Sequence, residues 1–442
     1  MGVFDKWFKS SKNGDVVLAP SFGRYSDSNK SPTQYEYWEK ALVSFEMEDY
    51  VESIAHFLPY LKDEVADNVV WERSTSAIRF HFFQGSRRIN AIIDAKHFRA
   101  EVCIAKTSSL NVGLLRRLVE KNYKLNYSRF ALDPENNIVI VFTSALIDAS
   151  PYKIYYALKE IAIHADKLDD ILMDEFDSLY PIDEGLKRHL SEREKEVKFN
   201  FVKDQIGMVL SKIADGNLDK DQYPGAISYL LLDLCYRLDY LIKPEGYLMD
   251  ALERIHRIYF SSPEPALSLQ DKNSNIIVEY KAVLSRTKAQ VDREIYSVVS
   301  TFGVTHPFGH EQINTYIDGE LKNIIWYLDN KFNYIVDAIC GYIVGFLLFN
   351  YALPNPVKGL FHLYYQIIYS QFFSDLGIEQ DFYIQKDGKL NAKVIKKAIE
   401  RVFAEHKGSY KFLGGDVNLN YENSAAFSYS FLLMVRGLDF RK

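Results

Sequence analysis

Hydrophobic and polar positions repeat with a helical period in the first part of the chain and then with a period of two. From residue 33 to 62, apolar residues recur three or four positions apart, which predicts a hairpin of two helices. From 78 to 83, apolar and polar residues alternate, as they do in a half-buried strand. The pattern predicts two further strands, at 89–94 and 98–105.

The following segment predicts that this sheet is completed and covered by helices. Asn111 precedes a run with helical periodicity, and residues 123–132 and 138–142 are two more strand candidates around a turn at 133–137. Ser150-Pro151 then opens a long helix. The expected order is a helical hairpin, three strands, a helix, two strands and a helix. Because short turns join the strands, we expect an antiparallel sheet packed against helices.

Residues 180–442 are predicted to be helical almost throughout. The expected helical segments are 206–213, 227–242, 248–260, 276–302, 312–328, 332–351, 359–373, 391–406 and 425–437. The fold class is therefore α+β, with an irregular arm at 1–32, an α+β domain at 33–175 and a large all-α domain at 180–442. The apolar segment 338–353 is shorter than the roughly 20 residues that cross a bilayer, so we expect a buried core helix and no transmembrane segment.

Composition narrows the class of protein without naming a reaction. The chain has 442 residues, 48% hydrophobic and 25% charged, with a formal net charge of −6. These values exclude a disordered chain and a general attraction to nucleic acid. The cysteines, Cys103, Cys235 and Cys340, are too far apart for a metal motif and odd in number. We expect free thiols in a reducing, cytoplasmic location.

Residues 114–140 carry a resemblance to a known family. Leu114–Asn122 reads LLRRLVEKN, 127–133 reads YSRFALD and 137–140 reads NIVI, followed by the helix start at Ser150-Pro151. Over residues 50–175 the chain resembles YbjN-type proteins of the type III secretion chaperone-like superfamily. The resemblance implies a bacterial protein whose small, often dimeric domain holds a protein segment on its sheet or helix surface. It supplies no catalytic residue, and the helical region has no counterpart in simple chaperones.

The sequence shows no signature of a catalytic or cofactor site. It contains no phosphate-binding glycine loop and no nucleophile elbow, so we predict no catalytic residue and no cofactor. His306, His310 and Glu311 are weak candidates for zinc ligands. Pro307 and Gly309 interrupt a helix there, which favours loop histidines and no metal site.

The functional prediction is a non-catalytic protein-binding or chaperone-like protein. Its alternative is an enzyme with an active site in the helical domain. The partner-binding candidates are Phe83, Ile93, Arg87 and Arg88, which lie in and beside the first predicted hairpin. We expect the partner to be a protein or the chain's own helical domain and not nucleic acid, and a homodimer remains an open alternative. The basic residues Lys96, Arg99, Arg116 and Arg117 are interpreted as ordinary solvated charge.

Overall fold

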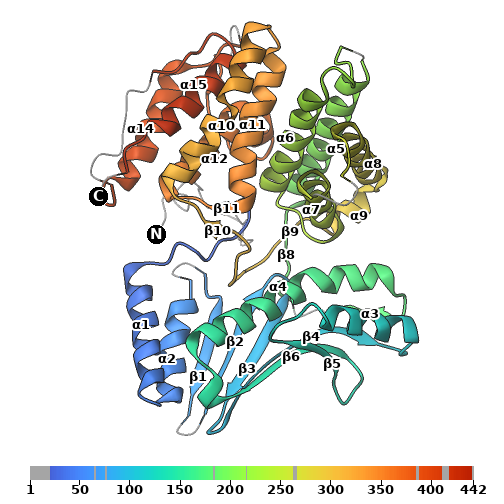
Figure 1. The fold of residues 1–442 in the computed structure, drawn as a ribbon, viewed down its shortest axis with the longest axis vertical. Helices are drawn as coiled ribbons and strands as arrows, with labels where there is room; N and C mark the ends of the chain where they lie inside the picture. The colour runs from blue at the N-terminus through green and yellow to red at the C-terminus, as the bar shows by residue number, and fades with distance from the viewer. Residues whose placement is uncertain are drawn as a thin grey trace. The chain divides into compact units, whose positions relative to one another are not determined.

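The chain forms two compact units, drawn in Figure 1. The computed structural model describes residues 20–440 except 64–65, 75–76, 183–184, 216, 262–265, 385–387 and 411–417. Unit 1 comprises residues 25–189 and 296–304, and the described part of unit 2 comprises 20–24, 190–295 and 305–440. Of the predicted irregular arm, residues 1–19 lie outside the described residues.

Unit 1 combines helices with an antiparallel sheet, as the sequence predicts. Its elements are α1 (Pro32–Glu46), α2 (Tyr50–Leu61), β1 (Val69–Arg73), β2 (Ile78–Gln84), β3 (Arg87–Ile93), β4 (His97–Thr107), α3 (Val112–Asn122), β5 (Arg129–Leu132), β6 (Ile138–Ala145), a 3-10 turn (Leu146–Asp148), α4 (Pro151–Glu175), β7 (Leu179–Tyr180), β8 (Arg188–His189) and β9 (Tyr296–Ser297). The main sheet has the order β1-β2-β3-β4-β6-β5, and β7 pairs with β4. Every one of these pairings is antiparallel.

The helices of unit 1 begin where the sequence places their caps. Ser31 and Gln34 form a reciprocal capping box at the start of α1. The Asn111 side chain accepts a hydrogen bond from the Leu114 N–H, and Ser150 caps α4 in the same way. In the predicted turn at 133–137, the Asp133 carboxylate accepts the N–H of Asn137 at 2.7 Å. These caps and this turn are formed by residues close in sequence, so they determine where the elements begin or end without distant contacts.

One face of the sheet, here called the inner face, packs against α4. Long apolar side chains of β2, β3 and β4 point to this face and are fully or almost fully buried, among them Phe82, Ile93 and Phe98. Helix α4 contacts β2, β3, β4 and β6, and it crosses the sheet in Figure 1. The core of unit 1 therefore lies between α4, the α1–α2 hairpin and this one face.

In unit 1 one strand is missing from the prediction, and one predicted boundary is wrong for a tertiary reason. β1 was not predicted, and the strand expected over 123–132 begins only at Arg129. Before Arg129, the Glu160 carboxylate on α4 accepts the backbone N–H groups of Asn126, Tyr127 and Ser128 at 2.7–3.0 Å. Because these donors bind a side chain, they are withdrawn from a strand ladder.

The helix expected over 276–302 is also wrong, because it ends at Ser285. A short helix follows, and residues 296–304 then belong to unit 1. There the Gln84 side chain accepts the backbone N–H groups of Thr301 and Phe302, at 3.2 and 3.0 Å. Phe302 is 2% exposed and packs in the core of unit 1. A segment distant in sequence therefore completes this core.

The structure describes four two-residue strands after residue 180, of which β8 and β9 belong to unit 1 and two belong to unit 2. Unit 2 is otherwise helical. Its elements are α5 (Glu192–Ala214), α6 (Pro224–Ile242), α7 (Gly246–Phe260), α8 (Leu269–Ser285), α9 (Lys288–Asp292), β10 (His306–Pro307), α10 (His310–Asp329), α11 (Asn333–Asn350), β11 (Tyr351–Ala352), α12 (Asn355–Ile368), α13 (Ser370–Asp375), α14 (Ala392–His406) and α15 (Ser424–Arg436). The prediction of a large helical C-terminal region is confirmed.

The apolar helix α11 lies at the centre of unit 2. It contacts α6, α10, α12 and α15. In the described part of the chain it is the single helix that could cross a membrane by length and composition, and 78% of that window is buried inside the protein. This burial is that of a core helix. Gly345 permits close approach to α6, because a Cβ there would lie 2.5 Å from the Tyr236 Cβ.

Candidate functional site

The face of the sheet opposite α4, here called the outer face, is built by two rows of cross-strand neighbours. The first row runs through residues that are paired in register on successive strands: Glu72, Arg79, Ile92, Arg99 and Thr143. The second row runs across all six main strands in the same way: Val70, His81, Asn90, Glu101, Val141 and Arg129. Directly paired residues share one face, so each row forms a continuous strip.

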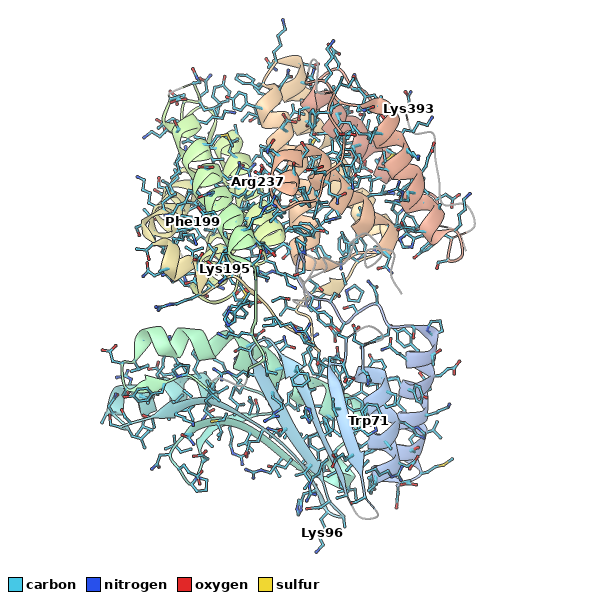
Figure 2. The ribbon with its side chains drawn as sticks, turned by 180° about the vertical axis from the view of Figure 1, so that it is seen from behind. Trp71, Lys96, Lys195, Phe199, Arg237 and Lys393 are labelled. Carbon is cyan, nitrogen blue, oxygen red and sulfur yellow. The ribbon has the colours of Figure 1, made fainter. Side chains whose placement is uncertain are left out.

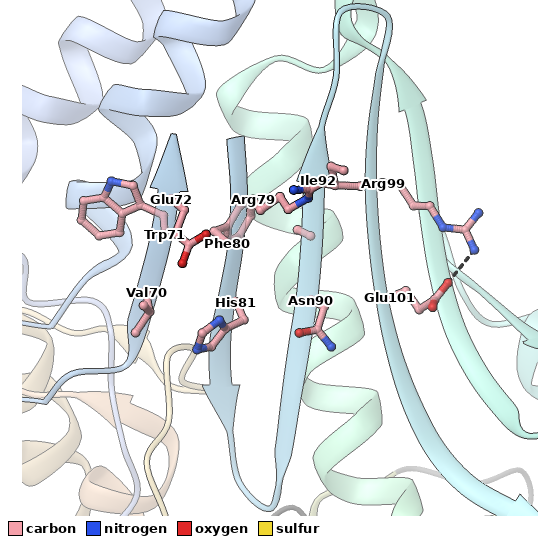
Figure 3. A pocket seen from close by; sticks show the side chains of 11 residues that line it. Val70, Trp71, Glu72, Arg79, Phe80, His81, Asn90, Ile92, Arg99 and Glu101 are labelled. Carbon is pink, nitrogen blue, oxygen red and sulfur yellow. Dashed lines mark hydrogen bonds and ion pairs between the residues drawn. The ribbon is translucent and has the colours of Figure 1, made fainter. Parts of the chain in front are cut away.

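The outer face is accessible, in contrast with the inner one. Arg79, Asn90 and Arg99 are exposed, and His81 and Ile92 are half-buried. The members of the two rows on β1, β2, β3 and β4 line a shallow depression of about 380 Å³, shown in Figure 3. Exposed polar side chains and the half-buried Ile92 thus lie next to one another over the middle strands.

Positive charge exceeds negative charge on the outer face. Arginines occur at positions 79, 88, 99 and 129, and glutamates at 72 and 101. Arg99 forms an ion pair with Glu101, marked by the dashed line in Figure 3. The pKa of His81 is lowered, first by burial and then by the charge of Arg88, so this imidazole is neutral at neutral pH. The excess charge therefore comes from arginines.

The structure brings two of the four partner-binding candidates together on the outer face. Phe83 is half-buried there and pairs across the hairpin with Arg88, which is exposed. The Phe83 ring lies 5.4 Å from the His81 ring, centroid to centroid. These two candidates sit at the end of the hairpin, next to the row that contains His81.

The other two candidates point to the inner face, which corrects the expected pair of Phe83 and Ile93. Ile93 is fully buried opposite Ile78. Arg87 is 3% exposed, and its Nη1 donates to the Ile182 carbonyl at 2.9 Å. Because side chains alternate along a strand, Ile92 occupies the outward position that was assigned to its neighbour. Sequence reasoning missed Ile92, Arg79 and Asn90, although the alternation of β3 around Ile89 could have identified the first.

Two of the basic residues interpreted as solvated charge, Arg116 and Arg117, form local ion pairs. Arg117 forms a bidentate hydrogen-bonded pair with Glu175, and Arg116 pairs with Glu120 on the same helix. Their interpretation as solvated, paired charge fits these contacts. Helix α3 instead presents an apolar stripe to solvent, with Val112 82%, Val119 68% and Tyr123 92% exposed. Leu115 lies on the same stripe, at helical spacing.

The zinc candidates do not converge on a common point that the structure describes. The His310 ring packs on Phe440, and its Nε2 lies 3.0 Å from the Val435 carbonyl oxygen, which makes that nitrogen a donor. His306 is exposed in β10 and Glu311 is exposed in the first turn of α10. Among the described residues, no group of three or more His, Cys, Asp or Glu could hold a metal ion.

The cysteines give no support to nucleophilic chemistry in unit 2. Cys235 and Cys340 are fully buried, and burial raises the pKa of both thiols. The Cys235 Sγ donates to the Leu252 carbonyl at 3.3 Å. A buried thiol with a raised pKa is unreactive.

Comparisons with known proteins add no assignment. No protein-family model matches the chain, and no curated protein is similar to it. The outer face and the chemistry of its residues are therefore the basis for assigning a function.

Proposed function

We propose that the chain is a non-catalytic, chaperone-like protein whose unit 1 holds an acidic protein segment on the outer face of its sheet. The single observation that carries the proposal is the alignment of arginines and apolar side chains by the strand register in the two rows. The resemblance of residues 50–175 to type III secretion chaperone-like proteins points to the same class. The buried free thiols Cys235 and Cys340 support a reducing, cytoplasmic location.

The apolar side chains of the outer face supply affinity, and the arginines supply orientation. Ile92 and Phe83 are already half-buried, so burying their remaining exposed part contributes less than the about 1.5–3 kcal/mol that full burial of each side chain would contribute. An exposed ion pair contributes only about 0–1 kcal/mol. We therefore expect arginines such as Arg79 to select an acidic segment and to speed its association.

Protein fits the outer face better than single-stranded nucleic acid. Binding of unpaired bases uses several exposed aromatic rings as stacking platforms. Among the outward residues of the two rows, the only ring is that of His81, and the adjacent Phe83 is half-buried. Ile92 offers aliphatic surface, which suits side chains of a protein segment.

The test is a quantitative pull-down with the full chain from cells that make the protein naturally. Wild type is compared with Ile92→Asp, which places a carboxylate among the arginines at the centre of the depression. The matched control is Val278→Asp, an exposed position on α8 in unit 2. Each lysate is divided into a nuclease-treated half and an untreated half, and bound proteins are identified by mass spectrometry.

The expected result is a protein with an acidic segment that wild type and Val278→Asp retain equally and Ile92→Asp loses at least tenfold. Circular dichroism establishes that both variants are folded. Equal retention by Ile92→Asp would refute the assignment of the outer face. Loss of the bound material on nuclease treatment would transfer the site to nucleic acid.

The apolar stripe of α3 supports a homodimer as part of this proposal. Its residues are spaced 3, 4 and 4 positions apart, from Val112 through Leu115 and Val119 to Tyr123. Such a stripe can pack against the same stripe of a second copy running in the opposite direction. Dimerisation through α3 leaves the outer face of the sheet available for the partner.

A further inference from the structure

Residues 20–24 form a short segment, here called the strap, that docks on unit 2 although the chain continues from it into unit 1. Unit 1 takes up the chain at Tyr25, the residue after the strap. The strap contains neither helix nor strand. The carboxylates that bind its Arg24 lie 215 and 229 positions further along the chain. The strap is therefore held by tertiary contacts and not by local structure.

The site on unit 2 that receives the strap, here called the socket, is built from six residues: Asp239 and Tyr240 on α6, Glu253 on α7, Phe349 on α11, His362 on α12 and Phe373 on α13. Figure 2 shows the side chains of this unit and labels Arg237, which precedes Asp239 by two positions on α6. The Phe22 side chain packs against the buried core of unit 2 without being one of its buried members. Release of the strap therefore does not empty that core.

The Arg24 guanidinium is bound by two carboxylates and an aromatic ring. Its Nε and Nη2 donate to the Asp239 carboxylate at 3.0 and 2.6 Å, and its Nη1 donates to Glu253 at 3.2 Å. The Arg24 Cζ lies 4.0 Å from the centroid of the Phe349 ring. A planar group that meets one carboxylate with two bonds and also stacks on a ring is a guanidinium, because an ammonium group lacks this fork.

The socket requires a cation for its buried carboxylate. Asp239 is 4% exposed, and Arg24 is the one cation that pairs with it among the described residues. A buried carboxylate that loses its partner is strongly unfavourable. The socket is therefore complete only when a guanidinium group occupies it.

The two residues before Arg24 add an aromatic anchor and a close backbone approach. The Phe22 ring centroid lies 5.0 Å from that of Phe373 and 5.3 Å from that of His362. Gly23 has a φ of +68°, and its N–H donates to the Tyr240 carbonyl at 2.8 Å. A Cβ on Gly23 would lie 2.6 Å from the Tyr240 ring, so this position favours glycine on both counts. The socket thus reads three consecutive residues.

We propose that the socket is a recognition site for an extended peptide with the sequence Phe-Gly-Arg, and that the strap occupies it as an intramolecular ligand. A partner segment of this chemistry binds only when the strap is displaced, because the strap is tethered and competes at a high effective concentration. The site is therefore autoinhibited. It is independent of the binding proposed for unit 1, since the outer face there selects an acidic segment and the socket selects an arginine.

Fluorescence anisotropy with a labelled peptide of residues 20–26 tests the proposal on the full chain. Wild type is compared with the double variant Phe22→Ala/Arg24→Ala, whose strap no longer fills the socket. We expect the double variant to bind the peptide at least tenfold more tightly than wild type does. A peptide that carries Arg24→Lys should bind the double variant at least tenfold more weakly, because lysine cannot make the paired bonds to one carboxylate.

Two further variants separate the socket from general effects of substitution. The matched control is Arg436→Ala, which removes a surface arginine that binds Asp318 through two nitrogens, and it should bind the peptide as weakly as wild type does. The single variant Phe22→Ala keeps Arg24 on Asp239, so it stays folded if the double variant does not. It should bind the peptide with an affinity between those of wild type and the double variant, and binding no tighter than that of wild type would overturn the role of the strap.

Chemical rescue tests the guanidinium position by itself. Thermal unfolding of Arg24→Ala is measured alone, with about 10 mM methylguanidinium and with about 10 mM methylammonium. We expect methylguanidinium to raise the melting temperature of this variant, methylammonium to leave it unchanged, and neither cation to affect wild type. Peptide binding to the double variant no tighter than to wild type, equal binding of the arginine and lysine peptides, or a melting temperature that methylguanidinium shifts no more than methylammonium does would each overturn the proposal.

Discussion

Replacing Phe302 by alanine should destabilise the sheet unit, although the residue lies among helices in the sequence. Its ring centroid is 5.6 Å from that of Phe82 and 5.4 Å from that of Tyr155. Burying a phenylalanine contributes about 1.5–3 kcal/mol, and with the cavity the substitution costs about 3–5 kcal/mol. Because segment 296–304 is largely irregular and can collapse into the space, we expect the lower end, about 3 kcal/mol.

Hydrogen exchange with mass spectrometry is the assay, because it reports each unit separately. A loss of about 3 kcal/mol accelerates the slowest amides about 100-fold. We expect this acceleration in peptides from β2, β3 and α4 and no change in peptides from α6 and α11. The control is Trp326→Ala on α10, whose side chain is 47% exposed and should cost under about 1 kcal/mol.

Two outcomes would refute this reasoning about Phe302. One is unchanged exchange in the sheet peptides, and the other is acceleration confined to α6 and α11.

The contacts of Phe302 also determine how a truncated chain should behave. A fragment that lacks residues 180–442 also lacks Phe302, so it loses part of the core of unit 1. If that fragment aggregates, the loss of the Phe302 side chain from the core explains the aggregation, and exposure of a binding surface is not needed to explain it.

Three further predictions concern close packing, pH and self-association. Gly345→Ala should lower the stability of unit 2 by about 1–2 kcal/mol, because a Cβ there would lie 2.5 Å from the Tyr236 Cβ and the cost of this clash exceeds the helix-propensity gain of about 1 kcal/mol. Gly319→Ala, whose added Cβ would have nothing within 4 Å, should stabilise the unit. Urea unfolding midpoints measure both changes. Burial lowers the pKa of His256 and of His362 from 6.5 to about 4, so the unfolded chain takes up protons first and stability should fall as the pH drops from 6.5 towards 4. Denaturation at pH 7 and pH 4.5 measures that loss, which His362→Phe should reduce; an equal loss in the variant would contradict the assignment. Val119→Glu on α3 should convert a dimer to a monomer in light scattering after gel filtration, whereas a wild-type monomer would contradict the α3 interface.

Local patterns in the sequence determined the kinds of elements and many of their ends. Alternation in 78–83 is sufficient for β2, because one face of a strand is buried and the other is not. Ser31, Asn111 and Ser150 cap their helices with their own side chains, so these starts need no distant contact. The apolar run of α11 likewise requires burial on every side.

The functional surface was decided by tertiary structure. Whether Ile92 or Ile93 faces outward depends on which strand face packs against α4, and a shift of one residue exchanges them. Glu160 withdraws residues 126–128 from the sheet, and Gln84 binds the backbone of 301–302 across more than two hundred positions. Such bonds join groups far apart in the chain. Local periodicity cannot encode them, because their free energy appears only when the folding of unit 1 brings donor and acceptor together.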